Sequence, residues 1–223
     1  MICFEMEETM TNKEIYEKIN KNALERYQKR YYELGEGPRT LGWGCQEDQL
    51  ERFQAMCDNY DFEGKTVMDV GCGFADWYSF LLSKGISCNY IGVDIIPEFI
   101  ECCQKKYSDA SFIHADIMLE EDKLPKADVV LTNGTLNFKQ TLVDNLVYTK
   151  DFMKVAFDKA RDVVIMDFLS TYLTSDYPKE DFVYYHDPKQ VLEMAFEYSN
   201  NLKMVHNYKA IPQKEFMLFL YKG

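Results

Sequence analysis

Basic residues are scarce in this sequence, and long apolar runs are missing. Of its 223 residues, 25 are lysine or arginine and 37 are aspartate or glutamate, which gives a net charge of −12. Because proteins bind nucleic-acid phosphates with clustered lysine and arginine, this balance predicts that nucleic acid is not a partner. No stretch reaches the roughly 18 apolar residues that a membrane span needs. The start, Met1–Glu8, also lacks the basic end and apolar run of a signal peptide, so we expect no membrane partner.

The seven cysteines form no CxxC pair and show no Cys/His spacing of the zinc-binding kind. An odd number of cysteines suits reduced thiols, which predicts a cytoplasmic protein. The sequence contains neither internal repeats nor low-complexity tracts. With 47% hydrophobic and 15% aromatic residues, the chain can bury a substantial core. The simplest organisation is a single domain in which residues 1–60 form a helical cap and residues 61–223 form the core.

The most informative stretch is Val67-Met68-Asp69-Val70-Gly71-Cys72-Gly73-Phe74-Ala75-Asp76, which indicates a buried strand, a glycine turn and the start of a helix. In an α/β sheet such a turn binds a nucleotide-like cofactor. A dinucleotide-binding turn needs a small residue where this chain has Asp76, and an acid there would lie against a pyrophosphate, so NAD is disfavoured. The alternative spacing, acidic-x-Gly-x-Gly-x-small, suits a ligand that has no phosphate and one cationic end, as in S-adenosylmethionine. That spacing is met by Asp69, Gly71, Gly73 and Ala75.

With this turn the chain resembles the class I S-adenosylmethionine-dependent methyltransferases, and three further motifs extend the resemblance. The predicted second strand, Asn89–Asp94, ends in the acid that the family uses to hold the ribose hydroxyls. After the third strand, the resemblance places Asp116 beside the adenine amino group and the Ile117 backbone N–H beside a ring nitrogen. Asn133 begins the loop that lies next to the methionine end and the acceptor in the family. The motifs follow in the family's order over residues 60–168.

The resemblance implies that S-adenosylmethionine is the cofactor. Asp69 is expected to meet its ammonium group, because a buried strand rarely ends in an unpaired acid. Trp43, between two glycines, would either cover the cofactor or acceptor or anchor the N-terminal helices on the sheet. Magnesium-dependent members need a carboxylate cluster near the ends of the fourth and fifth strands, where only Asp167 is clearly placed, so no metal is expected. The predicted cofactor-binding residues are Trp43, Asp69, Gly71, Cys72, Gly73, Asp76, Asp94, Ile95, Asp116, Ile117 and Asn133.

The predicted fold is an α/β, Rossmann-like, seven-stranded and mostly parallel methyltransferase sheet. Helices are expected on both faces, with an antiparallel C-terminal strand and an N-terminal helical cover. The near-continuous apolar run at residues 163–168 is typical of a parallel strand that is buried on both faces. Periodicity and Pro97 place helices at residues 12–33, 46–60, 77–83, from 97, 142–160 and 188–199. The remaining strands are expected at residues 67–70, 89–94, 111–117, 127–132, 202–206 and 215–221, the last two joined through Ile211-Pro212.

The expected reaction is in-line attack of an acceptor atom on the sulfonium methyl group. A hydroxyl acceptor would need a general base, and His186 and His206 are the candidates because imidazole titrates near neutral pH. For each of them a structural role is the more frequent alternative. The aromatic segment 171–187 follows a strand's carboxyl end and is expected to line the acceptor pocket.

The acceptor is expected to be a small polar molecule, and oxygen is favoured as the methylated atom. A sugar or phospho-type precursor of a surface polysaccharide or secondary metabolite would fit. N-methylation of a small amine is the alternative, although Asn133-Gly134-Thr135-Leu136 lacks the Asn-Pro-Pro-aromatic pattern of adenine and glutamine N-methyltransferases. A non-catalytic partner subunit that binds the cofactor is a further alternative. The sequence leaves open whether the chain is a monomer or a homodimer.

Overall fold

A seven-stranded sheet forms the centre of the computed structural model, which describes residues 10–44, 46–175, 179–208 and 214–223. The strand order is β3-β2-β1-β4-β5-β7-β6, and β7 runs antiparallel to both of its neighbours. The other neighbouring strands pair in parallel. This is the methyltransferase sheet that the sequence predicts. The strands are β1 Thr66–Val70, β2 Asn89–Asp94, β3 Ser111–His114, β4 Ala127–Thr132, β5 Ala160–Leu169, β6 Leu202–Val205 and β7 Glu215–Tyr221.

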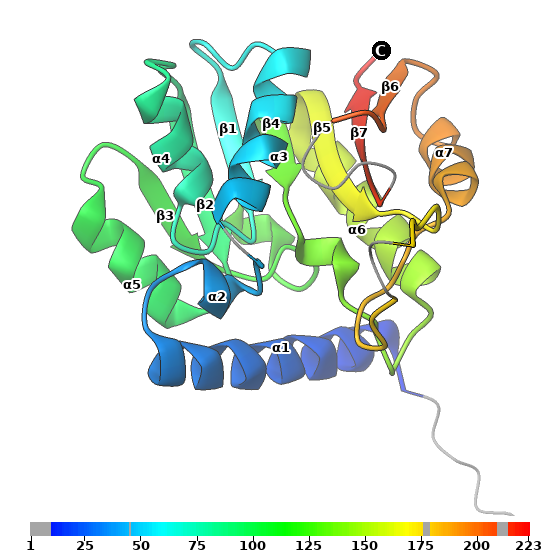
Figure 1. Cartoon of the computed structure of the whole chain (residues 1–223), viewed down its shortest axis with the longest axis horizontal. Coiled ribbons are helices and arrows are strands. Elements are labelled where there is room, and N and C mark those ends of the chain that lie inside the picture. The colour runs from blue at the N-terminus through cyan, green and yellow to red at the C-terminus, as the bar shows by residue number, and fades with distance from the viewer. Residues whose placement is uncertain (1–9, 45, 176–178, 209–213) are drawn as a thin grey trace, which may run out of the picture.

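The position of the site follows from the strand order. β1 pairs with β2 on one side and with β4 on the other, so the chain changes direction across the sheet at this point. In open α/β sheets, ligands bind beyond the carboxyl ends of the strands at such a switch point. In Figure 1 the long helix α1, Asn12–Leu34, runs beneath this edge of the sheet, with the short α2, Pro38–Leu41, beside it.

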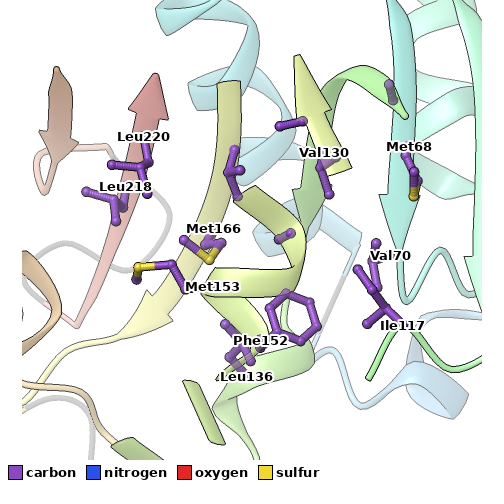
Figure 2. Packing of buried hydrophobic residues seen from close by; sticks show 14 of the residues in the cluster. Met68, Val70, Ile117, Val130, Leu136, Phe152, Met153, Met166, Leu218 and Leu220 are labelled. Carbon is purple, nitrogen blue, oxygen red and sulfur yellow. The ribbon is translucent and has the colours of Figure 1, made fainter. Parts of the chain in front are cut away.

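Helices cover both faces of the sheet. Buried residues of α3, α4 and α5 pack on one face, and buried residues of α6 and α7 pack on the other. Figure 2 shows the second face, where Phe152 and Met153 of α6 lie against Val130 of β4 and Met166 of β5. All four side chains are at most 1% exposed, so this face is a closed hydrophobic core. The remaining helices are α3 Gln46–Asn59, α4 Asp76–Ser83, α5 Pro97–Lys106, α6 Asn145–Lys159 and α7 Pro188–Phe196, with short 3-10 turns at Glu121–Lys123 and Thr135–Asn137.

The helix over residues 12–33 is confirmed, and its start has a physical cause. Thr11 accepts a hydrogen bond from the backbone N–H of Glu14, whose side chain accepts one from the Thr11 N–H. This reciprocal capping box satisfies donors that a helix start leaves unpaired. Leu24, Tyr27 and Tyr31 of α1 pack against a small apolar cluster of Phe74, Ile96 and Phe99, which attaches the helix to the core.

Several predicted boundaries differ from the structure. α6 starts three residues later than predicted because Asp144 caps it by accepting from the Leu146 N–H at 2.7 Å. β5 extends the predicted strand at both ends, and α7 ends at Phe196 rather than residue 199. The helix α2 is absent from the prediction. The predicted connection through residues 211–212 lies outside the described residues. Within the described part of the chain, no helix is both long and apolar enough to cross a bilayer.

Candidate functional site

A cavity of about 700 Å³ lies at the carboxyl ends of the central strands, and residues of α1 line one of its sides. The structure brings every predicted cofactor-binding residue to its wall, from Trp43 before the sheet to Asn133 after β4. Residues that the sequence separates by about ninety positions therefore face one space. The cavity also extends beyond them, toward the segments 135–141 and 180–183.

The glycine turn after β1 comes close to the loop after β4. Gly71 has φ +78°, and its N–H donates to the Val93 carbonyl at 2.8 Å. A Cβ atom at this position would lie 2.4 Å from the Thr135 hydroxyl oxygen. Only glycine combines this backbone conformation with so close an approach. Ala75, the small residue at the end of the motif, is the one non-glycine with a positive φ among the described residues, at +59°.

Asp69 lies at the end of β1, almost fully buried, with one carboxylate oxygen bonded to the Tyr90 hydroxyl at 2.6 Å. Burial raises the pKa of Asp69 to about 7, and the Tyr90 hydrogen bond opposes that shift. A cation placed beside this carboxylate would stabilise its ionised form. The side chain therefore suits the ammonium or sulfonium end of a ligand better than a phosphate.

Asp94, at the end of β2, is held by backbone N–H groups. Its two oxygens accept from the N–H groups of Gly73 and Ile96, each at 2.9 Å. Burial raises the pKa of Asp94 to about 6, while these hydrogen bonds lower it. An ionised carboxylate has about four lone-pair sites, so two remain for the neighbouring hydroxyls of a ribose.

Asp116 lies at the predicted adenine end, and α1 reaches it. Its carboxylate accepts from the Met118 N–H and from the side-chain amide of Asn20, both at 2.7 Å. Burial raises the pKa of this carboxyl group. Asn20 was not predicted to take part, because nothing in its spacing links α1 to the third strand.

The opposite end of the cavity contains Asn133, Gly134 and Trp43. Among the described residues, neither polar atom of the Asn133 side chain has a hydrogen-bond partner, although both atoms are buried. The Trp43 ring lies beside Gly134, where an added Cβ would come within 3.2 Å of it. The Arg52 guanidinium lies 4.5 Å from the centre of the same ring. Trp43 therefore forms part of the cavity wall and also anchors the N-terminal region to the loop after β4.

Two buried acids, Asp167 and Glu215, contact residues at the Trp43 end of the cavity. Asp167, at the end of β5, accepts from the Gly134 N–H at 2.6 Å, and burial raises its pKa to about 7. Glu215 forms an ion pair with Arg52, and both side chains are at most 5% exposed. The described residues contain no group of three His, Cys, Asp or Glu side chains that could hold a metal ion.

The two histidines proposed as a general base do not line the cavity. His186 is fully buried between Phe168 and Tyr184, and its Nε2 lies 3.0 Å from the Thr149 hydroxyl. Burial lowers the pKa of His186 to about 3. His206 packs edge-on against aromatic rings, and burial lowers its pKa as well. The hypothesis of a base role for either residue thus lacks support from the geometry, because neither faces the reacting space.

Comparison with known proteins agrees with this geometry. A family model described as "Methyltransferase domain" matches residues 61–202. The chain belongs to this methyltransferase family. A Mycobacterium tuberculosis protein named as a methyltransferase is 22% identical over 149 residues, which are 64% of this chain and 86% of that protein. The tRNA U34 carboxymethyltransferase of Azotobacter vinelandii is 26% identical over 123 residues, which are 52% of this chain and only 38% of the relative.

Solved structures show the same fold. The magnesium protoporphyrin IX methyltransferase of Synechocystis PCC 6803, solved with bound SAM, aligns with a TM-score of 0.63 and 14% identity, covering 98% of this chain and all of that one. S-adenosylmethionine is the cofactor of this methyltransferase. The cavity fits it, with carboxylates at the predicted ammonium, ribose and adenine positions and an unpartnered Asn133 at the methyl end.

Sequence reasoning missed part of the methyltransferase's cavity wall. Arg26 of α1 and the Arg52–Glu215 pair line it without having been predicted as site residues. The sequence contained one signal for the pair: Glu215 is the first residue of an otherwise apolar strand, and a buried acid there needs a partner. Arg26 gave no such signal, because arginine on a helix face is usually solvated.

Proposed function

We propose that this enzyme methylates an oxygen atom of a small polar acceptor. The observation that supports this most directly is the extent of the cavity. Beyond the cofactor motifs it continues to Lys139, Thr141 and Val183, with Lys214 also in its wall. A space of this kind, enclosed by α1, suits a small molecule that lies beside the cofactor.

The residues of the chain would mainly bind and align the reactants. When bound, S-adenosylmethionine supplies a methyl group already activated by the sulfonium. The loop at Asn133 and Gly134 would set the direction of approach, with Gly134 held by Asp167. α1 and Trp43 would keep water from the methyl group, and alignment of this kind supplies much of the barrier lowering in such a transfer.

Oxygen is proposed over nitrogen because the loop after β4 lacks the Asn-Pro-Pro-aromatic pattern of known N-methyltransferase groups. A small molecule is proposed over tRNA, the substrate in the name of the Azotobacter relative, because the net charge of −12 would repel a polyanion. We propose a sugar or phospho-type precursor as the acceptor. We also propose a cytoplasmic location, since Cys57, Cys72, Cys88, Cys102 and Cys103 are free thiols.

A product assay tests the proposal. The purified enzyme is incubated with S-adenosylmethionine labelled in the methyl group, together with small hydroxyl, carboxyl and amine compounds or with unmodified tRNA. We expect label in a small-molecule product attached through oxygen, identified by mass spectrometry. Asp94→Ala serves as the control that lacks the ribose contact. Label in tRNA, or on nitrogen only, would contradict the proposal.

A further inference from the structure

Two cations line the cavity without a carboxylate partner among the residues that the structure describes. Arg26 and Lys139 form no ion pair with any of these residues, and both belong to the cavity wall. Lys214 lines the same part, with its Nζ 5.9 Å from the Tyr185 ring centre.

Aromatic rings hold Arg26 in place. Its guanidinium carbon lies 4.2 Å from the centre of the Phe138 ring and 5.7 Å from that of Phe182. These rings come from the loop after β4 and from the segment after β5, which join through a bridge between Phe138 and Val183. A guanidinium that stacks on rings through its faces keeps its N–H donors at the edge, where they can bind an oxyanion. The backbone N–H of Lys139 donates to the Phe182 carbonyl at 3.1 Å, so this lysine lies next to the same bridge.

Among the described residues of this part of the cavity wall, no buried acid or histidine is free to deprotonate a hydroxyl. None of the three histidines lines the cavity. Glu215 lines it, but its oxygens are occupied by Arg52 and by the Tyr208 hydroxyl. Glu180, the other acid on this side, is exposed to solvent. An acceptor that is ionised before it enters needs no base.

We propose that the acceptor oxygen belongs to an oxyanion, a carboxylate or a phosphate, which Arg26 and Lys139 bind. This proposal rests on the proposed oxygen methylation and narrows its substrate class. One acceptor oxygen forms a bond to the methyl carbon while the C–S bond breaks and its electron pair goes to sulfur. The products are a methyl ester and S-adenosylhomocysteine, and no proton is transferred. An anion and a sulfonium thereby neutralise each other, a reaction that a water-excluding cavity favours.

Four probes that share one phenyl ring test the proposal: benzoate, phenyl phosphate, benzyl alcohol and benzylamine. Each is titrated into the full chain saturated with S-adenosylhomocysteine, with binding followed by NMR, and each is then incubated with S-adenosylmethionine to identify any methylated product. We expect benzoate or phenyl phosphate to bind more tightly than both other probes. Which of the two binds better distinguishes a carboxylate from a phosphate acceptor.

Matched variants locate the binding group. Arg26→Gln and Lys139→Gln should each weaken anion binding about tenfold, the usual effect of losing a charged hydrogen-bond donor, without changing S-adenosylhomocysteine affinity. Lys29 lies on an exposed part of α1 and pairs with Glu33. The control Lys29→Gln removes the same charge and should change neither the anion affinity nor the S-adenosylhomocysteine affinity. Equal or tighter binding of benzyl alcohol, no binding of either anion, or unchanged anion binding in Arg26→Gln would overturn the oxyanion proposal. A methylated alcohol would do so while leaving oxygen methylation intact, whereas N-methylated benzylamine as the only product would overturn the proposed function itself.

Discussion

Replacing Asp94 separates its contact with the cofactor from its role in the fold. In the free enzyme its carboxylate accepts backbone bonds from Gly73 and Ile96, each at 2.9 Å. Leaving two buried N–H groups unpaired costs about 1–3 kcal/mol each. Burial of the charge also opposes folding, since the pKa rises from 3.8 to about 6, and removing that penalty returns about 3 kcal/mol near neutral pH. Asp94→Ala should therefore change the free energy of unfolding by no more than about 3 kcal/mol.

The effect of Asp94→Ala on cofactor affinity should be larger than its effect on folding. Two charge-assisted hydrogen bonds to ribose hydroxyls contribute about 3 kcal/mol or more together, so we expect S-adenosylmethionine to bind at least about a hundredfold more weakly. Calorimetric titration measures the affinity, and urea unfolding measures the stability of the same variant. Asp109→Asn removes an equal charge from an exposed site outside the cavity and serves as the control. A folded Asp94→Ala variant with unchanged affinity would refute the assigned ribose contact.

Three further perturbations test the site. Burial raises the pKa of Asp69 to about 7, and a cationic cofactor prefers the ionised carboxylate. The affinity for S-adenosylmethionine should therefore fall as pH drops from about 8 to 6, and cofactor binding should release protons. Calorimetric titrations in buffers of different ionisation enthalpy would detect this release. The unliganded enzyme should gain stability over the same fall in pH, because the folded state takes up a proton that the unfolded chain does not hold until pH nears 3.8. Arg52→Met should lower the free energy of unfolding, measured in urea, by about 3–5 kcal/mol because Glu215 is left buried and unpaired. A double variant that also carries Glu215→Leu should recover much of this loss. A double variant no more stable than Arg52→Met would contradict the ion-pair explanation. Gly71→Ala should abolish measurable cofactor binding, since its Cβ would meet the Thr135 oxygen at 2.4 Å, and affinity within a few fold of the parent would show that the turn can rearrange.

The cofactor half of the cavity could be predicted from sequence because its information is local. Asp69, Gly71 and Gly73 lie within five consecutive positions. Asp94 ends one strand that periodicity reveals, and Asp116 follows another. Parallel strands then carry these ends to one edge of the sheet without further information. Hydrogen-bond partners such as Tyr90 could not be predicted in this way, since they depend on which side chains pack across neighbouring strands.

The acceptor half depends on contacts between distant elements, and no spacing rule describes them. Arg26 meets Phe138 and Phe182 only because α1 folds back across the carboxyl ends of the strands, and polar contacts such as that between Asn20 and Asp116 help to hold it there. Sequence reasoning looked for a histidine base, a residue type that is recognisable in isolation, and the histidines lie elsewhere. The net charge of −12 likewise gave no indication of Arg26 and Lys139 in the cavity wall, because a sum over the whole chain does not show where its basic residues lie. In this fold the residues that choose the acceptor become visible only once α1 is placed against the sheet.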